Sequence, residues 1–319
     1  MSNHTIVCAG IDTGKRKLDA AIGGTADPLQ VANTPDGHMA LSAWLRQHQV
    51  ERVGVEATGG YEHTVVIRLR ADGFTVIVFQ PGQVRAYARF KLKRAKTDKI
   101  DAVLIAACAA AREEDEIHAP PDPRIAPFAE QLTMIEQITE DIARIKTRRE
   151  NVRDDAIRQA WNNEIKRLGQ QKRTRLKALI AAIRQHPDLA KTLDLIASVD
   201  SIGLPSAVAI LVRMPEIGTI SRQKVAALAG LAPYPDDSGD HAGHRHIEGG
   251  RDRLRKALYN ATLAGAFRWN HQLKATYARL IAKGKHHKVA IIACARKLII
   301  FANTVVQRQT PWTNTRNEA

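Results

Sequence analysis

The order of strand-like and helix-like patterns in the first 110 residues most limits how this chain can fold. Three short runs of β-type residues come first, separated by glycine turns, which is typical of an antiparallel meander. Helix and strand patterns then alternate. The expected elements are strands at 5–12, 18–22 and 29–33, a helix around 39–45, a strand at 52–56, a helix at 62–71, an apolar strand at 74–79 and a helix from Pro81.

This order, βββαβαβα, is that of the ribonuclease-H-like (RNase H-like) nuclease fold, so we predict an α/β domain over residues 1–115. A change to acidic residues followed by four prolines indicates a linker at 116–127. In the segment 128–190 apolar residues recur at spacings of three or four. This spacing predicts a stalk of two long helices, packed as a coiled-coil hairpin or against another copy of the chain.

Residues 191–319 are predicted to form a mostly helical domain with a polar loop at 230–250. A turn at 201–204, between two apolar helical runs, is typical of a helix-hairpin-helix, whose hairpin amides bind phosphate. Pro205 stands where that motif would have a second glycine with a free amide. An ordinary turn between helices is therefore an equal alternative.

The charge balance favours a polyanionic partner. The chain has 48 Lys and Arg against 33 Asp and Glu, a net charge of +15, and this excludes an acidic or neutral surface. An excess of this size usually serves phosphate backbones, with plain solubility as the alternative. Between Arg144 and Lys177 twelve cations face four acids, which fits a solvated helix face as well as a surface for nucleic acid or dimerisation.

The three cysteines and the hydropathy pattern indicate the compartment. Cys8, Cys108 and Cys294 lie far apart in apolar surroundings, so we expect buried thiols rather than disulfides or zinc ligands. We find no signal peptide and no apolar stretch of membrane-spanning length. We therefore expect a cytoplasmic protein that has no membrane partner.

Four carboxylates stand where this fold would bring them together. Asp12 ends the first strand and Glu56 the fourth, and these strands are neighbours in the expected sheet. Asp98 and Asp101 lie three residues apart on a predicted helix and share a face. Crowded like charges are unfavourable without a cation, and oxygen ligands favour Mg²⁺ or Mn²⁺. We therefore predict a metal site for phosphodiester chemistry.

Two groups of cations are candidates for nucleic-acid contacts. The first precedes Asp98 and includes Tyr87 and Phe90, whose rings could stack on a base. The second follows Ser238, a residue that would ordinarily be only a turn former. The first group is Arg85, Arg89, Lys91, Lys93, Arg94 and Lys96, and the second is Arg245, Arg251, Arg253 and Arg255. The alternatives are neutralisation of the carboxylates by the first group and zinc binding by the histidines at 241, 244 and 246.

The combined motifs resemble the DEDD transposases of the IS110 insertion-sequence family and the related Piv-type DNA invertases. Further matches at 254–259 and 284–290 extend the resemblance over nearly the whole chain. The main matching segments are Asp12, Glu56 with Thr58-Gly59-Gly60-Tyr61, Lys96-Thr97-Asp98-x-x-Asp101-Ala102, Gly230-Leu231-x-Pro233 and Ser238-Gly239.

The resemblance implies a RuvC-like domain, a coiled coil and a C-terminal transposase domain with an essential serine. Asp12, Glu56, Asp98 and Asp101 would bind Mg²⁺, and Ser238 would be the nucleophile that forms a phosphoserine link to DNA. Members are thought to be guided by a structured bridge RNA that pairs with donor and target DNA. The expected protein is a prokaryotic, nucleoid-associated homo-oligomer, a dimer that assembles to a tetramer.

Three other classes of protein remain open from the residues. Gly10-Ile11-Asp12-Thr13-Gly14 is similar to the first phosphate loop of actin-like and sugar-kinase ATPases, although no second phosphate loop follows. A Holliday-junction nuclease would use the carboxylates without the serine. A packaging protein would bind RNA or DNA without catalysis.

Overall fold

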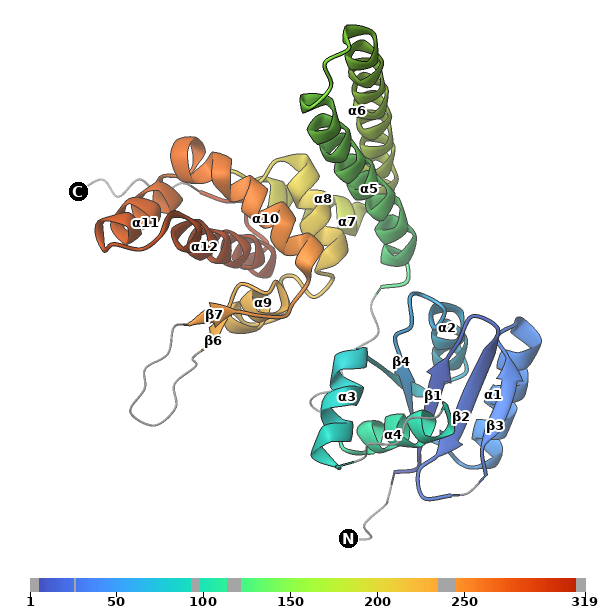
Figure 1. The fold of residues 1–319 in the computed structure, drawn as a ribbon. Helices are drawn as coiled ribbons and strands as arrows, with labels where there is room; N and C mark the ends of the chain where they lie inside the picture. Colours follow the sequence, from blue (N-terminus) through green and yellow to red (C-terminus); the bar gives the residue numbers. More distant parts are fainter. Residues whose placement is uncertain (1–5, 26, 93–97, 114–121, 235–244, 314–319) are drawn as a thin grey trace. The chain divides into compact units, whose positions relative to one another are not determined.

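The computed structural model describes residues 6–25, 27–92, 98–113, 122–234 and 245–313, with the side chains at 98–100 excepted (Figure 1). The chain divides into two compact units, Met1–Ala119 and Pro120–Ala319. The two long helices of the expected stalk belong to the second unit. Each unit is described by itself.

A five-stranded mixed sheet forms the centre of the first unit. The strand order is β3-β2-β1-β4-β5. β2 is antiparallel to both β1 and β3, whereas β4 is parallel to both β1 and β5. The strands are β1 (Cys8–Thr13), β2 (Lys17–Ile22), β3 (Leu29–Ala32), β4 (Arg52–Glu56) and β5 (Thr75–Phe79). With the helices described next, this order confirms an RNase H-like α/β unit.

Different helices cover the two faces of this sheet. α1 (Pro35–Gln47) and α2 (His63–Ala71) bury Leu41, Leu45 and Leu69 against the strand residue Ile11 on one face. Full burial of each such side chain stabilises the fold by about 1.5–3 kcal/mol. α3 (Pro81–Phe90) and α4 (Asp98–Ala110) pack on the other face in a second, smaller apolar cluster. The unit therefore has three layers, helix, sheet and helix.

The backbone of α4 lies directly on the sheet because glycines of β1 and β4 leave room for it. A Cβ on Gly10 would overlap the backbone of Ala102, and one on Gly54 would crowd Ile105. At the far end of α4 the buried Arg52 donates hydrogen bonds to the Ala109 and Arg112 carbonyl oxygens, at 3.0 and 2.7 Å. The positive charge of Arg52 also interacts favourably with the partial negative charge at the C-terminal end of α4.

The second unit begins with a helical hairpin, α5 (Ile125–Glu150) and α6 (Asp155–Arg184), whose facing side chains include Ile138, Ile145 and Leu168. The expectation that the linker extends to residue 127 is wrong, because α5 begins at Ile125. Pro127 is tolerated there because the first turn of a helix has no acceptor for its N–H. That the hairpin is a coiled coil stays a prediction.

The rest of the second unit is a helical bundle with one two-stranded ribbon. Its elements are α7 (Pro187–Ala197), α8 (Leu204–Arg213), α9 (Arg222–Leu228), β6 (Pro233–Tyr234), β7 (His246–Ile247), α10 (Asp252–Ala264), the π-helix η2 (Gly265–Trp269), α11 (His271–Ala282) and α12 (His287–Arg308). α7 and α8 flank the expected hairpin, where Pro205 occupies the first turn of α8 and removes an amide. The helix-hairpin-helix stays a prediction.

α12 is the central helix of this bundle. It is long and apolar enough to span a membrane by length and composition, so the expectation that no stretch reaches that length is wrong. More than half of its most apolar window is buried inside the unit. Leu298, Ile299 and Ala302 have no exposed surface, so packing within the bundle accounts for the apolar composition.

Candidate active site

Asp12 and Glu56 lie at the same edge of the central sheet. β1 and β4 are parallel with Ile11 opposite Val55, so the next residues on both strands are the two carboxylates. Because side chains alternate along a strand, Asp12 shares the face of Gly10 and Glu56 that of Gly54, the face on which α4 packs. Thr13 Oγ1 donates a hydrogen bond of 2.9 Å to the Glu56 carbonyl oxygen and ties the two strand ends together.

α4 begins at this same edge. Its residue Ala102 packs on Gly10 and lines a small cleft with Asp19, whereas its other end lies at Arg52, the first residue of β4. Asp101 directly precedes Ala102, and its side chain is half-buried. The side chain of Asp98 lies outside the described residues. Helix packing therefore brings Asp101 to the edge where Asp12 and Glu56 end their strands.

The donor chemistry of this edge suits a hard cation. Carboxylate oxygens are the ligands that Mg²⁺ and Mn²⁺ prefer. Within the described side chains, no three His, Cys, Asp or Glu are close enough to hold a metal ion. The predicted set includes Asp98, so the four-carboxylate site stays a prediction.

Asp19 is a fifth carboxylate at this edge that sequence reasoning missed. It pairs directly with Asp12 across the β1–β2 hairpin, so both side chains lie on the same face. Asp19 is nearly buried, accepts a hydrogen bond from Gln30 Nε2, and forms an ion pair with Lys17 Nζ at 3.0 Å. The register of the hairpin, counted from the turn between residues 13 and 17 along both strands, would have predicted that Asp12 lies opposite Asp19.

The loop after Glu56 is held by its own residues. Glu62 Oε2 accepts hydrogen bonds of 3.0 Å from the amides of Thr58 and Gly60. Gly59 and Gly60 both have positive φ, which only glycine adopts without strain. These contacts fix the path of the chain as it leaves β4, and so support the position of Glu56.

The first group of predicted nucleic-acid residues lies on an exposed end of α3. Arg85, Arg89 and Lys91 are exposed, and Lys91 Nζ lies 5.6 and 5.7 Å from the ring centroids of Tyr87 and Phe90. Phe90 itself is 77% exposed. Lys93, Arg94 and Lys96 lie outside the described residues. A cationic surface that also exposes an aromatic ring suits contact with a phosphate backbone and a base.

The second predicted group is mostly engaged inside the second unit. Arg251 forms an ion pair with Glu216 at 2.6 Å, and Arg253 forms one with Glu136 at 2.6 Å. Arg255 contacts Asp252 at 2.9 Å. Arg245 is exposed. Ser238 and the histidines at 241 and 244 lie outside the described residues. The role of Ser238 as the nucleophile and the zinc alternative therefore both stay predictions.

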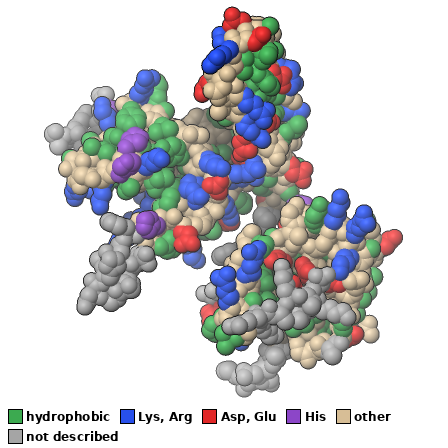
Figure 2. Space-filling view, viewed as in Figure 1, with side chains coloured by type: hydrophobic (Ala, Val, Ile, Leu, Met, Phe, Trp, Pro, Cys, Tyr) green, Lys and Arg blue, Asp and Glu red, His purple; other side chains and the backbone are tan. Residues whose placement is uncertain are grey.

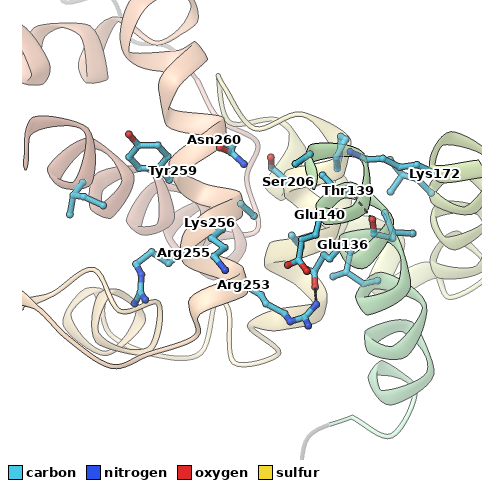
Figure 3. Close-up of a pocket in the computed structure, with 18 of the residues that line it drawn as sticks. Glu136, Thr139, Glu140, Lys172, Ser206, Arg253, Arg255, Lys256, Tyr259 and Asn260 are labelled. Atoms are coloured by element: carbon cyan, nitrogen blue, oxygen red, sulfur yellow. Dashed lines mark hydrogen bonds and ion pairs between the residues drawn. The ribbon is translucent and has the colours of Figure 1, made fainter. Parts of the chain in front are cut away.

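A cavity of about 620 Å³ lies in the second unit between α5, α6, α8 and α10 (Figure 3). Its walls are mainly apolar, and Figure 3 shows Glu136 meeting Arg253 at one side, with Tyr259 and Asn260 on α10. Neither Asp12, Glu56 nor Asp101 lines it. Sequence reasoning did not identify this cavity, because its walls come from helices far apart in the chain.

The first unit combines an RNase H-like sheet with carboxylates at neighbouring strand ends, which is the donor chemistry of enzymes that process phosphodiesters with a divalent metal. Residues 9–157 match the DEDD transposase model of the IS110 type, described as a transposase, and residues 193–278 match a model described as a transposase of the IS116/IS110/IS902 family. The chain belongs to the IS110 family of transposases, and is thus a DNA transposase or recombinase.

Individual proteins are also similar. Two pilin gene-inverting proteins, from Moraxella bovis and Moraxella lacunata, are each 27% identical over 95% of this chain and 96% of their own length. RuvC of T. thermophilus, solved in complex with a Holliday junction substrate, is 17% identical, covering 32% of this chain and 90% of that chain, with a TM-score of 0.27.

Proposed function

We propose that this transposase exchanges DNA strands by Mg²⁺-dependent phosphoryl transfer through a covalent serine intermediate. The observation that carries the proposal is the meeting of Asp12 and Glu56 at adjacent strand ends, beneath the helix that begins with Asp98 and Asp101. The relatives named for gene inversion, similar over almost the entire chain, favour exchange between two DNA sites.

In this proposal the four carboxylates hold divalent metal, which when bound polarises the phosphodiester. The Ser238 oxygen attacks phosphorus, so a serine–phosphate ester forms as one phosphorus–oxygen bond of the DNA backbone breaks. The serine proton goes to solvent or a nearby base, and the departing sugar oxygen takes up a proton. The sugar hydroxyl of another strand then attacks the serine–phosphate ester, releases the Ser238 hydroxyl and restores a phosphodiester. No external energy source is needed.

The covalent intermediate provides the sharpest test of this chemistry. We expect the purified protein with Mg²⁺ and its own element's DNA to give a protein–DNA adduct that survives denaturation and disappears in Ser238→Ala. Ser206→Ala is the matched control, because it removes a serine hydroxyl from the same unit and should keep the adduct. Cleavage by Ser238→Ala at the wild-type rate would favour the nuclease without serine chemistry. ATP turnover without DNA would favour the kinase-like alternative.

We also propose that a structured RNA from the element guides the protein to donor and target DNA. The net charge of +15 and the exposed cations of α3 support binding to a polyanion of this kind. Purification from cells carrying the native flanking DNA, followed by sequencing of bound RNA, tests this directly. We expect one enriched RNA from the element's non-coding end, and a mixture that matches total cellular RNA would contradict the proposal.

The third proposed feature is a homo-oligomer, a dimer that assembles to a tetramer, in which subunits share the reaction. The test mixes two inactive variants, Asp12→Asn and Ser238→Ala. If one subunit supplies carboxylates and another the serine, the mixture recovers activity that neither variant has. Crosslinking on DNA that yields monomers alone, together with no recovery in the mixture, would contradict this arrangement.

A further inference from the structure

The C-terminal helices carry a charge pattern that the proposed function does not use. From 253 to 308 the chain has twelve Lys and Arg and no Asp or Glu. The segment forms most of α10, the π-helix η2, α11 and α12. Figure 2 shows Lys, Arg and His side chains, with hydrophobic ones among them, on the surface that α11 and α12 form in Figure 1. Such a surface attracts polyanions and disfavours acidic neighbours.

An aromatic cluster lies on this cationic surface. Phe267, Tyr277 and His287 come from η2, α11 and α12, with ring centroids 5.0 Å apart for Phe267 and Tyr277 and 5.7 Å for Tyr277 and His287. The planes of Phe267 and His287 differ by only 12°. The Tyr277 hydroxyl is hydrogen-bonded to His287 Nδ1 at 2.8 Å. The three rings therefore hold one another in place at the surface.

Phe267 and His287 are exposed and Tyr277 is half-buried, although the scaffold that holds them is buried. Phe267 is 46% exposed and the nearby Trp269 is 63% exposed. In contrast, Gly265 at the start of the π-helix packs so closely on Ser201 that a Cβ would overlap the serine side chain. Asn270, just after the π-helix, donates a hydrogen bond of 3.1 Å to the Asp200 carbonyl oxygen. The π-helix is thus fixed at both ends while its aromatic side chains face outwards.

Three cations are close neighbours of the ring residues in the sequence. Arg268 lies between the two exposed aromatic residues, and Lys285 and Lys288 flank His287. All three are exposed, and among the described residues none forms an ion pair. A π-helix is rare and frequently marks a functional site. Flat rings beside uncompensated cations suit a ligand that has both flat apolar faces and phosphates.

We propose that Phe267, Tyr277 and His287 form a stacking platform for an unpaired base of single-stranded nucleic acid, with Arg268, Lys285 and Lys288 contacting the neighbouring phosphates. Stacking on protein aromatics needs a base with a free face, which a continuous duplex does not offer. A cationic surface without acids disfavours a basic protein partner. The platform rests on the proposed function only in that the ligand is nucleic acid.

The test measures stacking directly and needs no divalent metal. The full-length protein is titrated into a short single strand carrying one 2-aminopurine, whose fluorescence falls when it stacks, and into a blunt duplex of the same sequence. Wild type should quench the single strand. Phe267→Leu, which keeps an apolar side chain without a flat face, should weaken single-strand affinity about tenfold and duplex affinity less than about twofold.

Three matched variants make the result specific. Met39→Ala removes an equally exposed apolar side chain, 46% exposed, from α1 and should leave both affinities unchanged. Tyr277→Phe keeps the ring but loses the hydroxyl, and should lie between wild type and Phe267→Leu. Phe267→Tyr keeps a flat ring and should quench as wild type does, which excludes misfolding as the cause of the leucine effect.

Two outcomes would overturn the platform. One is unchanged 2-aminopurine fluorescence on binding of wild type, and the other is equal loss of single-strand and duplex affinity in Phe267→Leu. The result is separable from the proposed chemistry, because Asp12→Asn should lose strand exchange and still quench fully. Quenching without strand exchange in wild type would contradict the chemistry alone.

Discussion

Gly10 of β1 and Ala102 of α4 touch backbone to backbone, so closely that a Cβ on Gly10 would overlap the Ala102 carbonyl oxygen. This contact sets the distance between the sheet and the helix that carries Asp98 and Asp101. Asp12 lies two residues after Gly10 on the same face of β1. Any side chain at position 10 would therefore push the carboxylates of the helix away from those of the strands.

We expect Gly10→Ala to destabilise the first unit by about 1–3 kcal/mol, because the added methyl group overpacks a site closed by backbone atoms. Urea unfolding followed by circular dichroism measures the effect. Gly82→Ala is the matched control, because nothing lies within 4 Å of its added Cβ and alanine is favoured in a helix. Equal stability of the two variants would contradict the close-packing account.

If Asp101 is a metal ligand as proposed, Asp101→Asn should reduce strand exchange by more than about 100-fold while leaving nucleic-acid affinity within about twofold, because losing that ligand would remove transition-state stabilisation and not backbone contacts. The same expectation holds for Asp98→Asn. Strand exchange on the native DNA and filter binding measure the two properties on one preparation.

The control for this prediction is Asp36→Asn, which removes an exposed carboxylate from the first turn of α1 in the same unit. It should leave both properties unchanged. Loss of binding and exchange to the same degree in Asp101→Asn would show that the residue serves folding or binding, and would remove it from the metal site.

Local patterns predicted much of the first unit. Glycine turns and apolar patterns predicted the succession of strands and helices along the chain, and the strand ends marked Asp12 and Glu56. What the sequence could not provide is contact between distant elements. The pairing of Arg52 with the end of α4, and the meeting of Phe267, Tyr277 and His287, depend on how elements distant in the chain pack together, which no short-range pattern records.

A second limit of prediction concerns charged residues. Arg251 and Arg253 read as free cations in the sequence, but each meets a glutamate from far along the chain, Glu216 and Glu136. A proline misled the prediction in another way. Pro127 indicated a linker, but it lies in the first turn of α5. Burial and pairing, which require the tertiary fold, decide both cases.

Arg89→Gln should weaken binding to DNA and RNA of any sequence to a similar degree and lower the salt slope of log affinity by about one, because an exposed cation on α3 neutralises a phosphate without reading a base. Affinities at several salt concentrations measure this. Arg46→Gln on α1 is the control, because Arg46 is already paired with Asp72 at 3.6 Å. An unchanged slope in Arg89→Gln would remove α3 from the binding surface.

Arg124 and Asp188 predict a pH dependence of the second unit. The Arg124 guanidinium lies 2.6 Å from the Asp188 carboxylate, and its hydrogen bond lowers the pKa of Asp188 to about 2. Because this pKa is lower in the folded than in the unfolded chain, the stabilisation is fully present above about pH 4 and is lost as the pH falls towards 2. The contact joins the start of α5 to the start of α7.

Asp188→Asn should therefore be less stable than wild type at about pH 5, and the difference should shrink as the pH falls towards about 2. Urea unfolding of the full chain at a series of pH values measures it. Asp155→Asn is the control. It removes an ion pair with Arg158 that lies within α6 and joins no separate elements. A constant difference across the whole range would show that Asp188 contributes through packing or capping rather than through its charge on Arg124.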